Sequence, residues 1–127
     1  MRDLPSGAAL LALGRELLLD ELLPLVPPER QRELRLLATA IAIVEREAIA
    51  GDGPAREIAE RLADFYGGAE MGPNNALLRR LACDLREGAF ETCQTRGRAA
   101  HAILWRLTIL KLREGNPQFL AENGFGE

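Results

Sequence analysis

The amino-acid sequence predicts an all-α protein, and three observations lead to this prediction. Leucine and alanine dominate the composition, whereas β-branched residues are sparse and aromatic residues make up only 5%, a balance that favours helices over strands. Apolar residues recur at helical spacing, and no stretch alternates as a strand would. Clusters of proline, glycine and asparagine divide the chain into segments of helical length. We therefore expect one domain over residues 1–127, a five-helix bundle with short loops and a C-terminal tail over residues 113–127.

Length and charge limit the class of protein. A chain of 13.9 kDa folds to a surface of roughly 6,700 Å², against about 20,000 Å² unfolded, so its core needs no metal or disulfide. The net charge of −3 and the pI near 5.3 argue against a dedicated nucleic-acid binder, which is usually basic. Two cysteines, Cys83 and Cys93, make no disulfide framework, and we expect reduced, partly buried thiols.

Two N-terminal features bear on location. Residues 1–6 carry charge and proline and lack the layout of a signal peptide. The leucine-rich stretch from Leu10 to Leu25 is interrupted by four charged residues, so it does not read as a membrane span. We expect a cytoplasmic protein that does not enter a membrane.

The first two helices are delimited by capping residues and prolines. The first is expected over Ser6–Leu23, with Ser6 as its N-cap. The second is expected from Pro28, since proline suits the first helical turn, to Ala50 before Gly51-Asp52-Gly53. Glu45 lies near the middle of the apolar face of this second helix. Either its carboxylate tilts outward to water, or it is buried and pairs with an arginine from another helix.

Three further segments follow. A helix from Pro54 carries a single apolar stripe of Ile58, Leu62 and Phe65 and ends at Gly67-Gly68. Asn74 or Asn75 caps the next helix, which stops at Gly88. Thr92 or Thr95 begins the fifth helix, and Asn116-Pro117 separates it from the tail because proline does not continue a helix easily. We expect the second and fifth helices to form the centre of the bundle.

The fifth helix has two apolar arcs rather than one at about 100° per residue. The first arc consists of Ala100, Ile103, Leu104, Leu107 and Leu110, and the second of Ala102, Trp105, Ile109 and Leu112. A helix with two arcs must be covered twice, either within its own domain or by another chain. If another chain covers the second arc, the candidate interface residues are Trp105, Ile109, Leu112, Arg106 and Arg113. Tryptophan and arginine are enriched at interface hot spots, although packing within the chain against the first helix must be excluded first.

No catalytic, cofactor or metal site can be assembled from the sequence. His101 is the single histidine, and it lies about 12 Å along the helix axis from Cys93, too far for one metal or for a nucleophile and its base. We expect His101 to be structural, at the edge of the core. No glycine-rich phosphate loop follows a strand.

Basic residues are concentrated in the second half of the chain. Arg96, Arg98 and Lys111 are candidate contacts to a phosphate-bearing ligand or to an acidic partner surface. The alternative is that these residues simply line solvated helix faces, where a lysine near a helix C-terminus is favourable.

Three stretches carry a family resemblance that spans nearly the whole chain. They are Arg2-Asp3-Leu4-Pro5-Ser6 with the later Glu21-Leu22-Leu23-Pro24, then residues 38–47 (ATAIAIVERE), and finally Lys111-Leu112 with Asn116-Pro117-Gln118-Phe119-Leu120. Together they resemble a family of small all-helical bacterial proteins catalogued as a domain of unknown function. The resemblance implies company with an aminoglycoside-phosphotransferase-like kinase and an acyl-CoA dehydrogenase, since members accompany both. One branch resembles the small subunit of a 4-hydroxyacyl-CoA kinase. At position 39 this chain has threonine where asparagine is more usual in the family, and Glu114-Gly115 replaces small apolar residues.

The resemblance and the absence of catalytic residues suggest a non-catalytic accessory subunit. It would bind a phosphotransferase-like kinase that acts on hydroxyacyl-CoA substrates, and the same arc of the fifth helix could instead form a homodimer. The alternative function is direct binding of acyl-CoA or another phosphate-bearing ligand. A partner-binding module should expose an apolar patch, whereas a ligand binder should enclose a cavity with arginines at its mouth.

Overall fold

The computed structural model describes residues 4–68 and 75–125, and both ranges are helical without a strand. The all-α prediction is confirmed. In chain order the elements are α1 (Gly7–Leu17), the π-helical η1 (Leu18–Leu22), the 3₁₀-helical η2 (Leu23–Leu25), α2 (Pro28–Ala50), α3 (Gly53–Phe65), α4 (Ala76–Arg86), α5 (Gln94–Gly115) and α6 (Pro117–Glu122). None of these helices combines the length and the apolarity that crossing a membrane requires.

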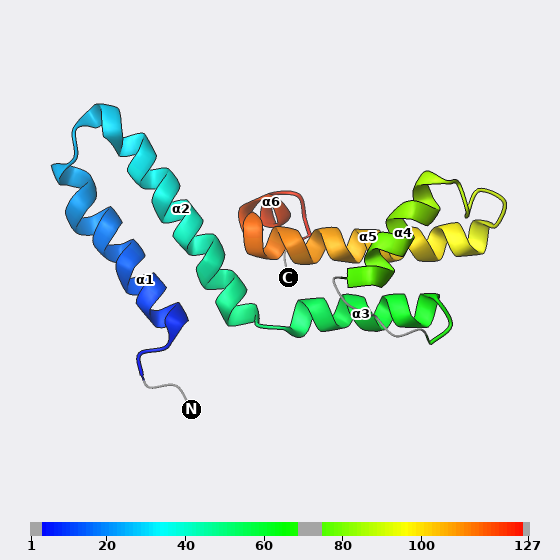
Figure 1. The fold of residues 1–127 in the computed structure, drawn as a ribbon. Coiled ribbons are helices and arrows are strands. Elements are labelled where there is room, and N and C mark those ends of the chain that lie inside the picture. The colour runs from blue at the N-terminus through cyan, green and yellow to red at the C-terminus, as the bar shows by residue number, and fades with distance from the viewer. Residues whose placement is uncertain (1–3, 69–74, 126–127) are drawn as a thin grey trace.

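The first two helices form an antiparallel hairpin (Figure 1). Ser6 caps α1 as predicted, because its hydroxyl accepts a hydrogen bond from the backbone N–H of Ala9 at 3.2 Å. The helical path continues past the expected Leu23 through the π and 3₁₀ segments to Leu25. The side-chain amide of Gln31 then donates to the carbonyl of Val26 at 3.3 Å, which ties the turn to the start of α2. The bounds of α2 are those predicted.

The hydrophobic core is built by α3, α4 and α5. Its buried residues are Ile58, Leu62, Phe65, Leu77, Leu81, Ala100, Ile103 and Leu110. Leu62 and Leu81 are fully buried, and the predicted stripe of α3 points entirely into this core. The prediction that the second helix is central is wrong, since Ala38 is its only buried residue. Its apolar face packs on α1 instead, and α1 itself has no buried residue.

The starts of α4 and α5 differ in detail from expectation. Asn75 precedes α4 in the left-handed conformation, with φ of 57°, and its side chain caps no backbone N–H. The other candidate cap, Asn74, lies outside the described residues, as do Arg2 and Asp3. Cys93, rather than a threonine, is the residue before α5.

The tail contains a helix that the sequence analysis did not predict. Asn116 ends α5 and also caps α6, because its side-chain oxygen accepts a hydrogen bond from the N–H of Phe119 at 3.2 Å. Pro117 then occupies the first turn, where its missing N–H costs nothing. Leu120 is 2% exposed, and α6 packs on the end of α5 (Figure 1). Asn-Pro thus stops one helix and starts another.

Candidate functional site

A shallow depression on α5 gathers most of the candidate interface residues. It has a volume of about 250 Å³ and is lined by Trp105, Arg106, Ile109, Arg113, Gly124 and Phe125. We call it the Trp105 depression. Leu112, the fifth candidate, is half-buried on the same helix but does not line it. Helical spacing explains the grouping, because residues three and four apart lie on one face of α5.

Trp105 is the largest apolar group in the depression and remains 50% exposed. Phe125, in the segment after α6, packs edge-on against its indole with ring centroids 5.4 Å apart. His101, one helical turn earlier, stacks on the indole at 6.4 Å. His101 is exposed, so the expectation that it borders the core is wrong. The second arc of α5 is therefore covered in part by the C-terminal segment, and its tryptophan still faces solvent.

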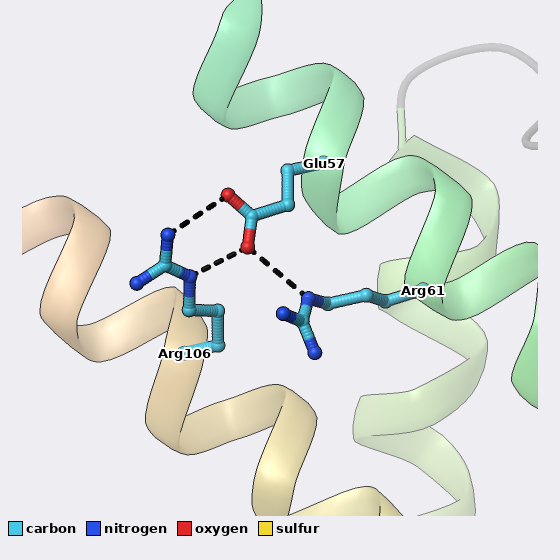
Figure 2. Close-up of polar contacts among 3 residues, drawn as sticks. All are labelled: Glu57, Arg61 and Arg106. Carbon is cyan, nitrogen blue, oxygen red and sulfur yellow. Dashed lines mark hydrogen bonds and ion pairs between the residues drawn. The ribbon is translucent and has the colours of Figure 1, made fainter.

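Arg106 is held in place by a carboxylate from α3. Its Nε donates to Glu57 Oε1 at 2.5 Å and its Nη2 donates to Glu57 Oε2 at 3.1 Å. Arg61, on the next turn of α3, also donates to Glu57 Oε1, at 3.2 Å (Figure 2). A bidentate pair of this kind fixes both position and orientation of the guanidinium. The ion pair locks α3 to α5 beside the indole.

This network shifts the protonation of both partners. Hydrogen bonding from Arg106 holds the pKa of Glu57 below its usual range, with a smaller contribution from Arg61, while partial burial opposes the shift. The same hydrogen bond raises the pKa of Arg106. Both side chains are 30% exposed. Glu57 is thus shared by two guanidinium groups, those of Arg106 and Arg61, and Arg113, which is exposed, also lines the depression.

The three candidate phosphate contacts do not form one site. The guanidinium of Arg96 lies over the Phe65 ring at 3.6 Å and donates to the Phe65 carbonyl, so it joins the end of α3 to α5. Arg98 is exposed. Lys111 lines a different cleft, to which neither Arg96 nor Arg98 contributes.

The cleft at Lys111 has a volume of about 420 Å³ and is lined by residues of α2, α3, α4 and α5. Its apolar lining includes Ile58 and Leu110, and two carboxylates, Glu47 and Glu114, share the lining with the lysine. Two negative charges against one positive charge disfavour a phosphate group. The cleft is open to solvent and does not have the arginine-rimmed, enclosed form expected of an acyl-CoA site.

Glu45 pairs with Arg15 of α1. Arg15 Nε lies 3.1 Å from Glu45 Oε2, and the two side chains are 31% and 17% exposed. The arginine partner expected from another helix is therefore present, but the pair is only partly buried. It fastens the two helices of the hairpin and takes no part in the Trp105 depression.

The thiols and acidic residues make no metal site in the part of the chain that the structure describes. Cys83 and Cys93 are free and both are exposed, which corrects the expectation of partial burial. Within residues 4–68 and 75–125, histidine, cysteine and carboxylate side chains form no group of three that could hold a metal ion.

Sequence reasoning missed Phe125, which lines the depression, and Glu57, which holds Arg106 in place. Phe125 is distant in sequence from Trp105, and only the fold of α6 brings it back. Glu57 is next to Ile58 on the flank of the α3 stripe. The sequence did contain an indication of Glu57. Arg106 lies between two apolar arcs, and an arginine in such a position requires an acidic partner from a neighbouring helix.

Comparison with known proteins gives one match. No curated protein and no solved structure is significantly similar to the chain. A family described as a domain of unknown function (DUF6285) matches residues 24–119, which run from the end of the hairpin turn into α6 and include the α5 part of the depression. The chain belongs to this family, DUF6285.

Proposed function

We propose that the protein is a non-catalytic accessory subunit that binds a phosphotransferase-like kinase acting on hydroxyacyl-CoA substrates. The observation that carries the proposal is the Trp105 depression, where a half-exposed tryptophan contacts a second aromatic ring and shares the lining with an exposed arginine. The kinase is inferred as the partner from the family resemblance described above, since members of that family accompany such kinases.

The chemistry of the depression suits a protein surface better than a small molecule. Tryptophan and arginine contribute the largest energies at protein interfaces, in well-packed central pockets. Arg106 is already oriented by Glu57, so little side-chain entropy is lost when a partner covers it. Phe125 fixes one edge of the indole in the same way. A partner side chain would fill the shallow hollow beside the indole, and Arg113 would meet an acidic residue at its rim.

Direct binding of acyl-CoA is the second candidate function. One feature of the cleft at Lys111 favours acyl-CoA binding, because its apolar lining lies beside the positive charge of the lysine. Its two carboxylates weigh against it, because they would repel the phosphates of coenzyme A. An isothermal titration with acyl-CoA, using Lys111→Glu as the control variant, distinguishes this candidate from the first.

The proposal is tested by expressing the chain with and without the accompanying kinase. We expect the wild type to co-elute with the kinase and Trp105→Ala to elute separately while keeping its helical circular dichroism. Thr108→Ala is the matched control, because Thr108 is exposed on the same helix and does not line the depression.

Two results would contradict the proposal or its details. If Trp105→Ala unfolds, Trp105 is a core residue and the placement of the interface is wrong. If the wild type never associates with the kinase and leaves its rate unchanged, the accessory-subunit function itself is wrong.

A further inference from the structure

The hairpin of α1 and α2 exposes more apolar surface than two helices can cover for each other. No residue of α1 is buried, and α2 buries only Ala38. Large side chains on both helices are about half exposed or more: Leu10 55%, Leu13 58%, Leu17 47%, Leu36 60%, Leu37 50% and Val44 48%. Figure 1 shows the hairpin extending away from the layer formed by α3, α4 and α5.

Four of these six residues lie on one side of the hairpin. At 100° per residue, Leu10, Gly14 and Leu17 follow one edge of the α1 surface that packs on α2. Leu37 and Val44 follow the corresponding edge of α2. Because the helices run antiparallel, both edges face the same side. We call these five residues the hairpin face.

The opposite side of α2 is polar. Arg35 and Thr39 lie there one helical turn apart, and Arg46 lies two turns further along. Thr39 is exposed, and its hydroxyl is satisfied within the helix by the carbonyl of Arg35, to which it donates at 3.0 Å. The hairpin is thus amphipathic as a unit. It joins the rest of the chain where α2 contacts α5 and Arg46 donates to the Glu114 carbonyl at 2.6 Å.

The spacing and shape of the hairpin face fit another pair of helices. Leu10 and Leu17 are seven residues apart, and so are Leu37 and Val44, which is the repeat of helices that pack side by side at a small crossing angle. A side chain at Gly14 would meet no other atom within 4 Å. The glycine therefore leaves room between two leucines for a side chain from a facing helix.

The chain exposes more surface than a compact monomer of its mass. The accessible surface is 9,321 Å², whereas a compact monomer of this mass exposes roughly 6,700 Å². The excess of about 2,600 Å² for one chain exceeds the roughly 800 Å² that each partner buries in a standard interface.

We propose that the hairpin face is the interface of a homodimer, in which two hairpins pack as a four-helix bundle. The five residues of the face carry no charge, and the nearest charged groups on that side of α2, Arg30 and Glu33, already pair with each other at 3.0 Å, so two copies can meet without an oppositely charged partner. A second copy of the chain has an identical hairpin with the same seven-residue spacing of apolar residues. Two such hairpins can pack together as a stable four-helix bundle. The face shares no residue with the Trp105 depression, so dimerisation leaves the proposed kinase contact accessible.

The experiment is sedimentation equilibrium of the purified full-length chain over a range of concentrations. We expect a mass of about 28 kDa, twice the 13.9 kDa of one chain, at micromolar concentration. Leu37→Glu places an unpaired carboxylate in the interface twice, and we expect it to weaken dimerisation about 100-fold or more. The matched control is Thr39→Glu, which adds the same charge to the polar side of the same helix and should remain dimeric.

A second measurement keeps the proposal testable if the Leu37 variant loses helix. Amide hydrogen exchange of the wild type should slow in α1 and α2 as the chain concentration rises, while exchange in α3 and α4 stays constant. A wild type that remains monomeric at high micromolar concentration would overturn the proposal, because the face would then be covered within one chain or by the kinase alone. A dimer that Leu37→Glu does not weaken would also overturn it.

Discussion

Removing the carboxylate that orients Arg106 should loosen the contact between α3 and α5 by a measurable amount. Two unit charges about 4 Å apart attract by about 4 kcal/mol at the effective dielectric constant near a protein surface, but desolvation and side-chain ordering cancel much of this. Hydrogen bonds to charged groups contribute about 1.5–3 kcal/mol net. Because Glu57 and Arg106 are each 30% exposed, we expect the lower end, about 1.5 kcal/mol.

The assay is a double-mutant cycle in urea with Glu57→Ala, Arg106→Ala and the double variant. Trp105 is the single tryptophan and adjoins Arg106, so its fluorescence reports on this contact directly. Arg61→Ala is the control. Arg61 pairs with the same carboxylate within one helix at 3.2 Å and is 46% exposed, which is typically worth about 0.3–0.5 kcal/mol.

The coupling should depend on pH with a definite sign. The folded pKa of Glu57 is lowered from the ordinary value of 4.5, so the pair stabilises the fold fully above that value. The stabilisation is lost as pH falls through the lowered folded pKa, where the carboxylate becomes protonated. A coupling energy near zero at pH 7, or one unchanged under strongly acidic conditions, would refute this account of how the depression is held.

Three further predictions concern stability in urea. Glu45→Ala should cost about 1 kcal/mol, not the 3–5 kcal/mol of a fully buried pair, because solvent reaches both Glu45 and its partner; unchanged stability would show that the pair contributes nothing. Leu81→Ala should cost about 2–5 kcal/mol, since its side chain is fully buried between α3, α4 and α5, and a cost below 1 kcal/mol would contradict the assigned core. Arg96→Lys should cost about 1 kcal/mol, because an ammonium group cannot both stack on Phe65 and reach its carbonyl, whereas Arg98→Lys, at an exposed position, should be neutral.

Local signals predicted much of the helical structure. The prolines and the Gly51-Asp52-Gly53 stop gave both ends of α2, and Ser6 gave the start of α1. Each of these signals acts within one turn, so it depends little on the rest of the fold. The α3 stripe was also read correctly, because a single narrow apolar face has one way to be buried.

The arrangement of the helices could not be predicted in the same way. Apolar periodicity shows that a face must be covered but not which element covers it, so α2 was placed at the centre although it packs on α1. Asn116-Pro117 was interpreted only as a stop, whereas the asparagine side chain also caps a new helix. The approach of Phe125 to Trp105 follows from that helix. The candidate arc of α5 could therefore be predicted from the sequence, whereas its contact with Phe125 could not.

The central claim is that this protein acts by binding a kinase partner, and the most direct measurement is the effect of the chain on that kinase. Phosphorylation of a hydroxyacyl-CoA would be followed while the purified chain is titrated into the kinase. We predict a saturable change in rate whose midpoint gives the dissociation constant, and a midpoint about 30-fold higher for Trp105→Ala, the loss typical of a hot-spot residue. A rate that does not respond to the wild-type chain at any concentration would contradict the claim.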